Sequence, residues 1–401
     1  MNRGTRAVLA VICGVAVASI YASQPVLGQM GRELSVPVEA VGWLVAAAQL
    51  GYLVGLILLV PLGDLLNRRR LIVVHLALLA GALALVAAAP VAWVAFAGLA
   101  STGMLAVVVQ TVVAYAAALS DPAERGRTLG VVTSGVVIGI LGSRILSGAL
   151  ADLWGWRSMF VALAVLAVGL AAVALFRLRA DSRTALVPSY LGVLRSFFHL
   201  LAQPSLLGRG AIAFFLFASF GALWSGMTVP LAGAPWHLSE TLIGVVGIAG
   251  LTGALGAARA GRWADAGHAN RVAGIALVVL LASWLLIAQL TWSLILLLLG
   301  VVVLDFAVQA VHVSNQHILT SADPGRVSTT IGAYMVFYSL GSAAGAASTT
   351  AVYAWAGWHG STMLGAAFAA AGLVAWVLAS SVRRASHATE GMSEPRPRLV
   401  A

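Results

Sequence analysis

The stretch Val301–Gln316, VVVLDFAVQAVHVSNQ, decides how this chain is interpreted. It places Asp305 in the middle of a long apolar segment, where a carboxylate costs roughly 2.5–3.5 kcal/mol to insert into a membrane. At about 100° per residue, Gln309, His312 and Gln316 lie within about 40° of Asp305 on one helical face. Val, Leu, Ala and Phe occupy most of the rest of the helix. This pattern is typical of a helix that lines a wet cavity inside a bilayer.

The composition is that of a polytopic membrane protein. The 401 residues are 61% hydrophobic and 9% charged, compared with roughly 25% charged in an average soluble domain. Apolar segments of about 20 residues, the length that a helix needs to cross a bilayer, recur along the chain. Twelve spans are expected, and their approximate bounds are 7–28, 41–63, 70–89, 92–118, 127–150, 158–177, 208–231, 240–260, 272–289, 293–317, 327–352 and 359–382.

A polar connector between the sixth and seventh spans divides the chain into two groups of six. Within it, apolar residues at helical spacing predict a short amphipathic helix at the membrane surface, with the stripe Tyr190, Leu194, Phe197, Phe198 and Leu201. The expected units are an N-terminal six-helix half at 1–178, a cytoplasmic connector at 179–207, a C-terminal six-helix half at 208–383 and a cytoplasmic tail at 384–401.

Every basic residue is an arginine, and the distribution of these arginines predicts the orientation of the chain. If the N-terminus is cytoplasmic, 20 of the 23 arginines lie on the cytoplasmic side and only Arg32 and Arg157 lie outside. Cytoplasmic loops carry an excess of basic residues, so both termini are expected in the cytoplasm. The net charge of +10 is therefore assigned to membrane topology and not to a nucleic-acid partner. Arg144 belongs to neither group.

Two loops at matching positions in the halves carry related sequences. The first is Pro61–Arg70, PLGDLLNRRR, and the second is Gly261–Gly267, GRWADAG, followed by Arg271. Both resemble the cytoplasmic loop motif of the major facilitator superfamily. The resemblance implies a conformational latch, in which an Asp near a helix end forms charge-assisted bonds with arginine in one conformation and loses them in another. The residues assigned to this latch are Asp64, Arg68, Arg69, Gly261, Asp265 and Arg271.

Glycines in the fifth span resemble the glycine-rich motif of the antiporter branch, whose members export substrate in exchange for protons. They are Gly130, Gly135, Gly139, Gly142 and Gly148. Close helix packing by small residues is the alternative explanation, and it requires no antiport.

The resemblance covers nearly the whole chain. It implies an all-α polytopic membrane protein with the major facilitator fold, whose two pseudo-symmetric halves give alternating access to a central site. It further implies a monomeric secondary transporter in the plasma membrane (inner membrane) of a bacterium, with a small-molecule substrate, protons and the lipid bilayer as partners. The expected function is proton-coupled efflux of a small amphiphilic molecule. Uptake or facilitated diffusion of a small polar solute, and a non-transporting membrane receptor or accessory subunit, are the alternatives.

The resemblance also places Arg144 and Asp305 on opposite walls of the central cavity. Arg144 lies about 16 residues into the fifth span, roughly 24 Å along the helix. Arginine would keep Asp305 ionised while the halves are close, and separation would favour proton uptake. His312 is a candidate to assist, because histidine titrates near neutral pH. A fixed ion pair that joins two helices without titration is the alternative.

Polar and aromatic residues in the cavity-facing spans are candidates for substrate binding, because amides and amphipathic rings suit a solute with polar and apolar parts. For each of them, a hydrogen bond between helices is the alternative role. The candidates are Tyr21, Gln24, Gln49, Tyr52, Gln110, Trp224, Gln309, Tyr334 and Tyr338.

The sequence offers no support for catalysis or for a cofactor. A phosphate-binding G-x-x-x-x-G-K-S/T loop cannot occur in a chain without lysine. His312 and His317 are five residues apart and fall on different helix faces, so they do not predict a metal site. Cys13 is the single cysteine, so no intramolecular disulfide can form. We therefore expect neither enzymatic activity, nor a cofactor, nor a metal.

Overall fold

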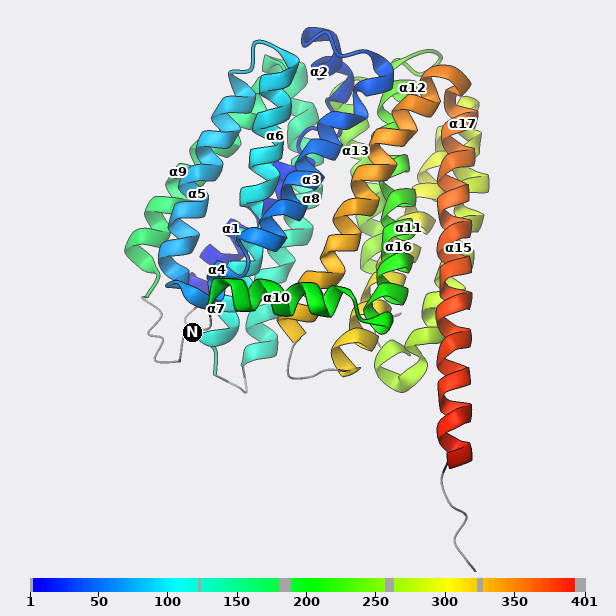
Figure 1. Cartoon of the computed structure of the whole chain (residues 1–401). Helices are drawn as coiled ribbons and strands as arrows, with labels where there is room; N and C mark the ends of the chain where they lie inside the picture. Colours follow the sequence, from blue (N-terminus) through cyan, green and yellow to red (C-terminus); the bar gives the residue numbers. More distant parts are fainter. Residues whose placement is uncertain (1–2, 122–123, 180–188, 257–262, 323–326, 394–401) are drawn as a thin grey trace, which may run out of the picture.

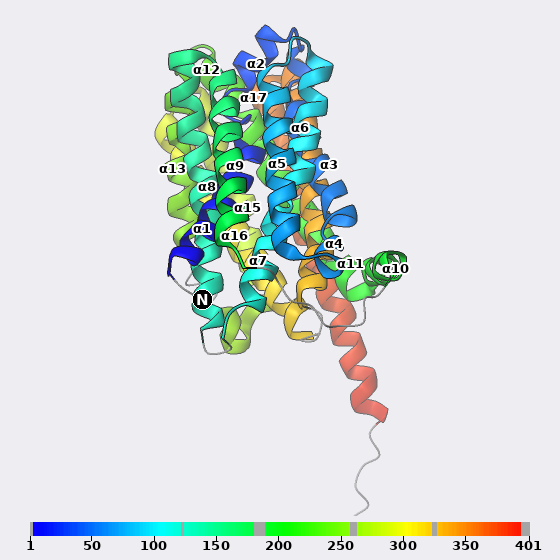
Figure 2. The same cartoon turned by 90° about the vertical axis from the view of Figure 1, so that its left-hand side faces the viewer.

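The computed structural model describes residues 3–121, 124–179, 189–256, 263–322 and 327–393. Within these ranges the regular elements are helices and no strand occurs. Figure 1 shows long helices running side by side through the molecule, with α10 (Tyr190–Leu201) lying across the end at which the N-terminus is found. Figure 2 shows α2 (Leu27–Glu33) and α12 (Thr228–Ala232) at the opposite end.

The N-terminal group of six spans uses nine helices besides α2, because the fourth span is interrupted and short helices precede the second and third spans. In chain order they are α1 (Arg3–Tyr21), η1 (Val38–Ala40), α3 (Gly42–Leu58), α4 (Leu62–Leu65), α5 (Arg68–Ala87), α6 (Ala92–Ala106), α7 (Val108–Ala118), α8 (Arg125–Trp154) and α9 (Arg157–Arg177).

The C-terminal group follows α10. Its elements besides α12 are α11 (Pro204–Gly226), α13 (Glu240–Gly256), η2 (Ala264–His268), α15 (Ala269–Ile287), η3 (Ala288–Thr291), α16 (Leu294–Ala322) and α17 (Val327–Ser393).

The expected twelve spans are confirmed. Ten helical segments of the described ranges are long and apolar enough to cross a membrane. One of them, in α17, contains two spans, because the helix breaks at Gly357 with φ 61° and ψ −159°, a conformation that favours glycine. The shorter apolar helix α13 supplies the remaining span between the seventh and the ninth.

Each group of six spans has its own hydrophobic core. The first core contains buried residues between Leu9 and Leu178, joined by Ala346, and the second contains buried residues between Ile212 and Ala369. Packing therefore follows the division into two halves. The expected boundaries at 1–178, 179–207, 208–383 and 384–401 stay a prediction, and residues 180–188 and 394–401 lie outside the described ranges.

The connector contains the helix α10, which begins where Ser189 Oγ accepts a hydrogen bond from the N–H of Gly192 at 3.1 Å. Its inner face buries Phe197 and Leu200 against a small cluster that also contains Tyr334. Phe198, which the sequence pattern assigned to the apolar stripe, is 52% exposed. The apolar face that contacts the bundle is therefore narrower than the stripe.

The halves meet along two pairs of helices, α3 with α17 and α8 with α13. Glycine makes both contacts close. A Cβ atom on Gly42 would lie 2.0 Å from the carbonyl oxygen of Ala346, and one on Gly148 would lie 2.2 Å from that of Glu240. Small residues at such positions allow helix backbones to approach each other.

Polar contacts join the halves at the end of the bundle away from the N-terminus. Asp152, near the end of α8, accepts hydrogen bonds from the backbone N–H groups of Glu240 at 3.1 Å and Thr241 at 2.9 Å. A carboxylate is favoured at a helix N-terminus, because the N–H groups there lack partners in the helix. In the other helix pair, the N–H of Gly42 donates to Thr350 Oγ1 at 3.1 Å. The two halves are thus joined at this end.

Close packing accounts for part of the glycine-rich pattern in α8. A Cβ atom on Gly135 would lie 1.9 Å from the carbonyl oxygen of Ala10, and one on Gly139 would lie 2.2 Å from that of Gly14. A Cβ atom on Gly130, by contrast, would meet no heavy atom within 4 Å. The contact between α1 and α8 therefore depends on particular glycines of the motif.

We expect Gly135→Ala to lower the free energy of unfolding by about 1–3 kcal/mol, because the added methyl group overpacks the contact with α1. Thermal unfolding of the purified protein measures this loss. The matched variant Gly130→Ala should unfold at or above the parent temperature, because alanine favours the helix over glycine. Equal unfolding temperatures for the two variants would contradict the packing explanation.

Candidate functional site

Arg144 is held between the two halves. It is buried, with 4% of the residue exposed, and its Cζ atom lies 3.4 Å from the ring centroid of Trp224 on α11. Its Nη2 donates a hydrogen bond to Gln24 Oε1 at 3.0 Å. A guanidinium over an indole face gains a cation–π attraction, which strengthens when water is excluded. Arg144 from the first half therefore binds an aromatic ring of the second.

Asp305 lies in α16, and 5% of the residue is exposed. Its Oδ1 accepts a hydrogen bond from Trp224 Nε1 at 3.3 Å. On α13, a Cβ atom added to Gly250 would lie 2.1 Å from Oδ2 of Asp305. The carboxylate therefore occupies space that any larger residue at position 250 would take.

Trp224 connects the two charged residues. Among the described residues, neither a hydrogen bond nor an ion pair within 4.0 Å joins Arg144 to Asp305 directly. The indole face contacts the guanidinium, and the indole N–H contacts the carboxylate. The structure thus brings the two predicted charges to the same aromatic ring without pairing them.

Other aromatic residues surround Arg144. The hydroxyl groups of Tyr21 on α1 and Tyr338 on α17 are hydrogen-bonded to each other, which links the halves again. The ring of Tyr21 lies 5.7 Å from Arg144 Cζ and that of Phe220 lies 6.0 Å away. Phe217 packs against Tyr338 with ring centroids 4.1 Å apart. The sequence interpretation included the two tyrosines but missed Phe217 and Phe220, which look like ordinary core residues in an apolar span.

His312 lies seven residues after Asp305, about 10 Å along the helix. Its Nδ1 forms a hydrogen bond with the hydroxyl of Tyr334 and its Nε2 with Gln316 Nε2, both at 3.2 Å. Gln309, between Asp305 and His312, is half-buried. The polar face predicted for α16 is therefore present, but the partners of His312 are Tyr334 and Gln316.

The remaining predicted binding residues lie in the first half. Gln110 Nε2 donates to the hydroxyl of Tyr52 at 3.1 Å, which joins α7 to α3. Gln49 is buried, and its Oε1 accepts no hydrogen bond from the described part of the chain. The first pair fits the role of a bond between helices, whereas the buried Oε1 atom of Gln49 has no donor in the described part of the chain.

Sequence reasoning misplaced Arg209, which it assigned to the cytoplasmic loops. Arg209 is 1% exposed inside the C-terminal half. Its Nη1 donates to Asn315 Oδ1 at 3.1 Å and its Nη2 to Asn270 Oδ1 at 2.6 Å. A signal was present in the sequence, because Pro204 favours the start of a helix and places Arg209 inside its second turn.

The first predicted latch loop is described in part. Asp64 lies in α4, and its side chain is outside the described part of the structure. Arg68 Nε donates to the carbonyl oxygen of Gly63 at 3.2 Å. Arg69 donates through Nη2 to the carbonyl oxygen of Leu175 at the end of α9.

The second predicted latch loop is described less fully. Gly261 lies outside the described residues, as does the side chain of Asp265, although its backbone belongs to η2. Arg271 is exposed in the first turn of α15. The latch in both loops stays a prediction.

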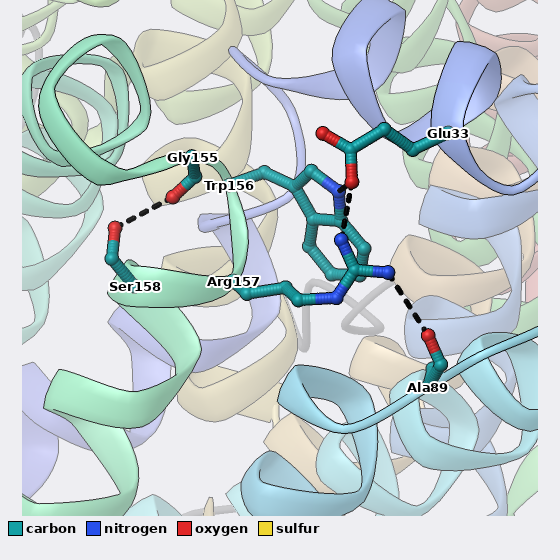
Figure 3. A network of polar contacts seen from close by, with 6 residues as sticks. All are labelled: Glu33, Ala89, Gly155, Trp156, Arg157 and Ser158. Atoms are coloured by element: carbon teal, nitrogen blue, oxygen red, sulfur yellow. Dashed lines mark hydrogen bonds and ion pairs between the residues drawn. The ribbon is translucent and has the colours of Figure 1, made fainter.

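A polar cluster around Glu33, Trp156 and Arg157 lies at the end of the bundle away from the N-terminus (Figure 3). Glu33, at the end of α2, accepts hydrogen bonds from Trp156 Nε1 at 3.0 Å and from Arg157. Arg157 Nη2 also donates to the carbonyl oxygen of Ala89 at 3.1 Å. These bonds hold α2 against the starts of α6 and α9, so Gln24, which precedes α2, keeps its place beside Arg144.

These features define a class of protein: a membrane transport protein with two six-helix halves and buried charges between them. A family model described as Major Facilitator Superfamily matches residues 9–232, more than half of the chain. The chain belongs to the major facilitator superfamily, and it is a secondary transporter.

Two curated relatives and one solved structure illustrate the similarity. The Uncharacterized transporter YgaY of Escherichia coli O157:H7 is 38% identical over 369 residues, which cover 92% of this chain and 93% of that protein. The Multidrug resistance protein Stp of Mycobacterium tuberculosis (strain CDC 1551 / Oshkosh) is 32% identical over 136 residues, 33% of this chain and 25% of that protein. A bacterial homologue of the human lysosomal transporter Spinster, inward-facing and unoccupied, covers 95% of this chain and 96% of its own, with a TM-score of 0.73 and 15% identity. This last likeness shows the fold.

A double-mutant cycle tests whether Trp224 and Asp305 interact as described. We expect Trp224→Phe and Asp305→Ala to show a coupling energy of about 1–3 kcal/mol in the free energy of unfolding, because each removes one side of a buried, charge-assisted hydrogen bond. Trp358→Phe is the control, since Trp358 Nε1 donates to the carbonyl oxygen of Ile287 instead. Its effect should add to that of Asp305→Ala within about 0.5 kcal/mol. Additive effects for both pairs would contradict the assignment.

Proposed function

We propose that this chain exports a small amphiphilic molecule from the bacterial cytoplasm in exchange for protons, with Asp305 as the proton-carrying group. The observation that carries the proposal is the environment of Asp305. The carboxyl group is buried beside Trp224, whose ring contacts Arg144 of the other half, and its hydrogen bond within the described chain comes from the neutral indole of Trp224.

A buried ionised carboxylate needs a compensating partner. Desolvation of one charge costs several kcal/mol unless an opposite charge or hydrogen bonds offset it. In this conformation the guanidinium of Arg144 contacts Trp224 and Gln24 rather than Asp305. Protonation of Asp305 would remove the cost, and so would a shift of α8 that brings Arg144 to the carboxylate. These two arrangements supply the alternating states of a proton-coupled cycle.

The polar face of α16 offers a path for the proton. Gln309, His312 and Gln316 follow Asp305 on one side of the helix toward the end at which the N-terminus lies. His312 is bonded to both Tyr334 and Gln316, so a chain of polar groups continues from the middle of the bundle. In this proposal His312 passes the proton and Asp305 holds it.

The substrate site lies around Arg144 and the aromatic residues beside it. Tyrosine and tryptophan combine an apolar ring with a polar group, which suits a solute of mixed character. Gln49 contributes a buried acceptor without a described partner. The name of the Stp relative, Multidrug resistance protein, gives further support for export of such solutes. The proposed binding residues are Tyr21, Gln24, Gln49, Tyr52, Gln110, Trp224, Gln309, Tyr334 and Tyr338.

In the proposed transport cycle, the halves separate at the end away from the N-terminus, where polar contacts join them in this structure. If the termini are cytoplasmic, as the arginine distribution predicts, the contacts of Asp152 with Glu240 and Thr241 close the external side. These contacts must break when the site opens outward. The predicted latch of Asp64 and Asp265 would then hold the cytoplasmic side.

Expression in a bacterial host that lacks its own efflux pumps tests the direction of transport. We expect the chain to lower the steady-state accumulation of at least one amphiphilic compound in a panel, and Asp305→Asn to abolish this effect because asparagine cannot carry the proton. Glu39→Gln, an exposed carboxylate in η1, is the matched control and should behave as the parent. Undiminished export by Asp305→Asn would contradict the role of Asp305, and raised accumulation with the parent would indicate uptake.

Everted membrane vesicles test the coupling to protons. We expect vesicles with an acidic lumen to concentrate the compound inside, since protons that leave the lumen drive the solute in. With Asp305→Asn, the same gradient should give no accumulation above equilibrium. Parent vesicles that reach the same level with and without the pH gradient would show facilitated diffusion instead of antiport.

A further inference from the structure

A groove of about 710 Å³ opens on the outside of the C-terminal half, between the start of α15 and the last part of α17. One end of the groove is polar and contains His268, Asn270 and Arg271. The rest is apolar, and its walls include Ile275, Val278 and Trp376. The predicted proton and substrate residues do not line this groove.

The indole of Trp376 forms the floor of the groove, and its position is fixed by contacts with α15. Trp376 Nε1 donates a hydrogen bond to the carbonyl oxygen of Asn270 at 3.0 Å, which fixes the indole. A Cβ atom on Gly274 would lie 2.4 Å from Cζ2 of that ring. Glycine at this position lets the indole lie directly on α15, and so the groove stays open above it.

Two arginines lie near the polar end of the groove. Arg271 is exposed there, and Arg209 lies behind it, where its Nη2 donates to Asn270 Oδ1 at 2.6 Å. Asn270 Nδ2 in turn donates to Ser380 Oγ at 3.1 Å, so the side chain of Asn270 is fixed by two partners. Among the described residues that line the groove, none is acidic. This end of the groove is therefore suited to an anion.

The apolar part of the groove faces outward from the bundle. Ile275 is 67% exposed and Val278 is 52% exposed, although both belong to a span that crosses the membrane. Their surroundings in the bilayer are therefore acyl chains. A ligand that fits both parts of the groove has an anionic group attached to a hydrocarbon chain.

We propose that this groove binds one anionic phospholipid, with the phosphate at Arg271 and an acyl chain along Ile275, Val278 and Trp376. Basic pockets between membrane-spanning helices bind anionic headgroups in this way, and the cytoplasmic leaflet is rich in such lipids. The start of α15, which forms the polar end of the groove, lies at the same end of the bundle as the N-terminus, and the arginine distribution predicts that this end is cytoplasmic. The bound lipid would tie the start of α15 to α17, next to the second predicted latch loop.

Thermal unfolding of the full chain in a neutral detergent tests the proposal, with phosphatidylglycerol, phosphatidylcholine or inorganic phosphate added. We expect phosphatidylglycerol to raise the unfolding temperature to a saturating value, because a ligand stabilises the state that binds it. Arg271→Gln should raise the half-saturating concentration about fivefold, the effect of one basic residue near an anionic headgroup. Val278→Trp should remove the shift by filling the groove.

Two controls separate the groove from the general surface. Arg195→Gln removes an exposed arginine of α10, and Leu285→Trp enlarges a residue of α15 that is 72% exposed and does not line the groove. Both should respond to phosphatidylglycerol as the parent does.

Three results would overturn the proposal. Phosphatidylcholine could give the same shift as phosphatidylglycerol, which would remove the recognition of charge. Inorganic phosphate could reproduce the shift, which would assign the polar end to a free anion. Finally, Arg271→Gln and Val278→Trp could respond to phosphatidylglycerol as the parent does, which would show that the lipid binds elsewhere. If the purified parent were a dimer and Val278→Trp a monomer, the occupant of the groove would be a second copy of the chain.

Discussion

The centre of the structure is built around two buried opposite charges, Arg144 and Asp305, which lie near each other but form no ion pair. Arg144 and Asp305 belong to different halves, and each contacts Trp224. The arrangement requires room on α13, where Gly247 faces the Arg144 side chain and Gly250 faces the Asp305 carboxylate. Because no ion pair within 4.0 Å joins the two charges, a movement that changed their separation would change the energy of both. The proposed proton coupling rests on this property.

Two kinds of contact join the halves: close backbone packing at glycines, and hydrogen bonds at one end of the bundle. Glycines such as Gly42 and Gly148 let the backbones of both helix pairs approach closely, with no large side chain between them at these positions. Polar bonds such as those that Asp152 accepts from Glu240 and Thr241 join the halves at one end. The cluster of Glu33, Trp156 and Arg157 lies within the first half and does not join it to the second.

Much of the fold could be predicted from the sequence, because spans of 20 apolar residues, loop arginines and repeated loop motifs are local signals. Asp305 and Arg144 were visible for the same reason, since a charge inside an apolar span stands out. The role of Trp224 as their common partner was not visible, because it depends on which faces of α8, α11 and α16 meet. Arg209 was misplaced because a buried arginine near a helix start looks like a loop residue until Asn270 and Asn315 are brought to it.

Proton release on ligand binding tests the central claim most directly. The experiment uses a weakly buffered detergent solution that contains a pH indicator and a compound found to be exported. Binding of the compound to the parent should release protons from the protein. The indicator should report a pH change of the solution that increases with the amount of bound compound. Asp305→Asn should bind the compound with no such change, because the titrating group is gone. An equal proton release by the variant and the parent, or none by the parent across the pH range in which it transports, would contradict the account.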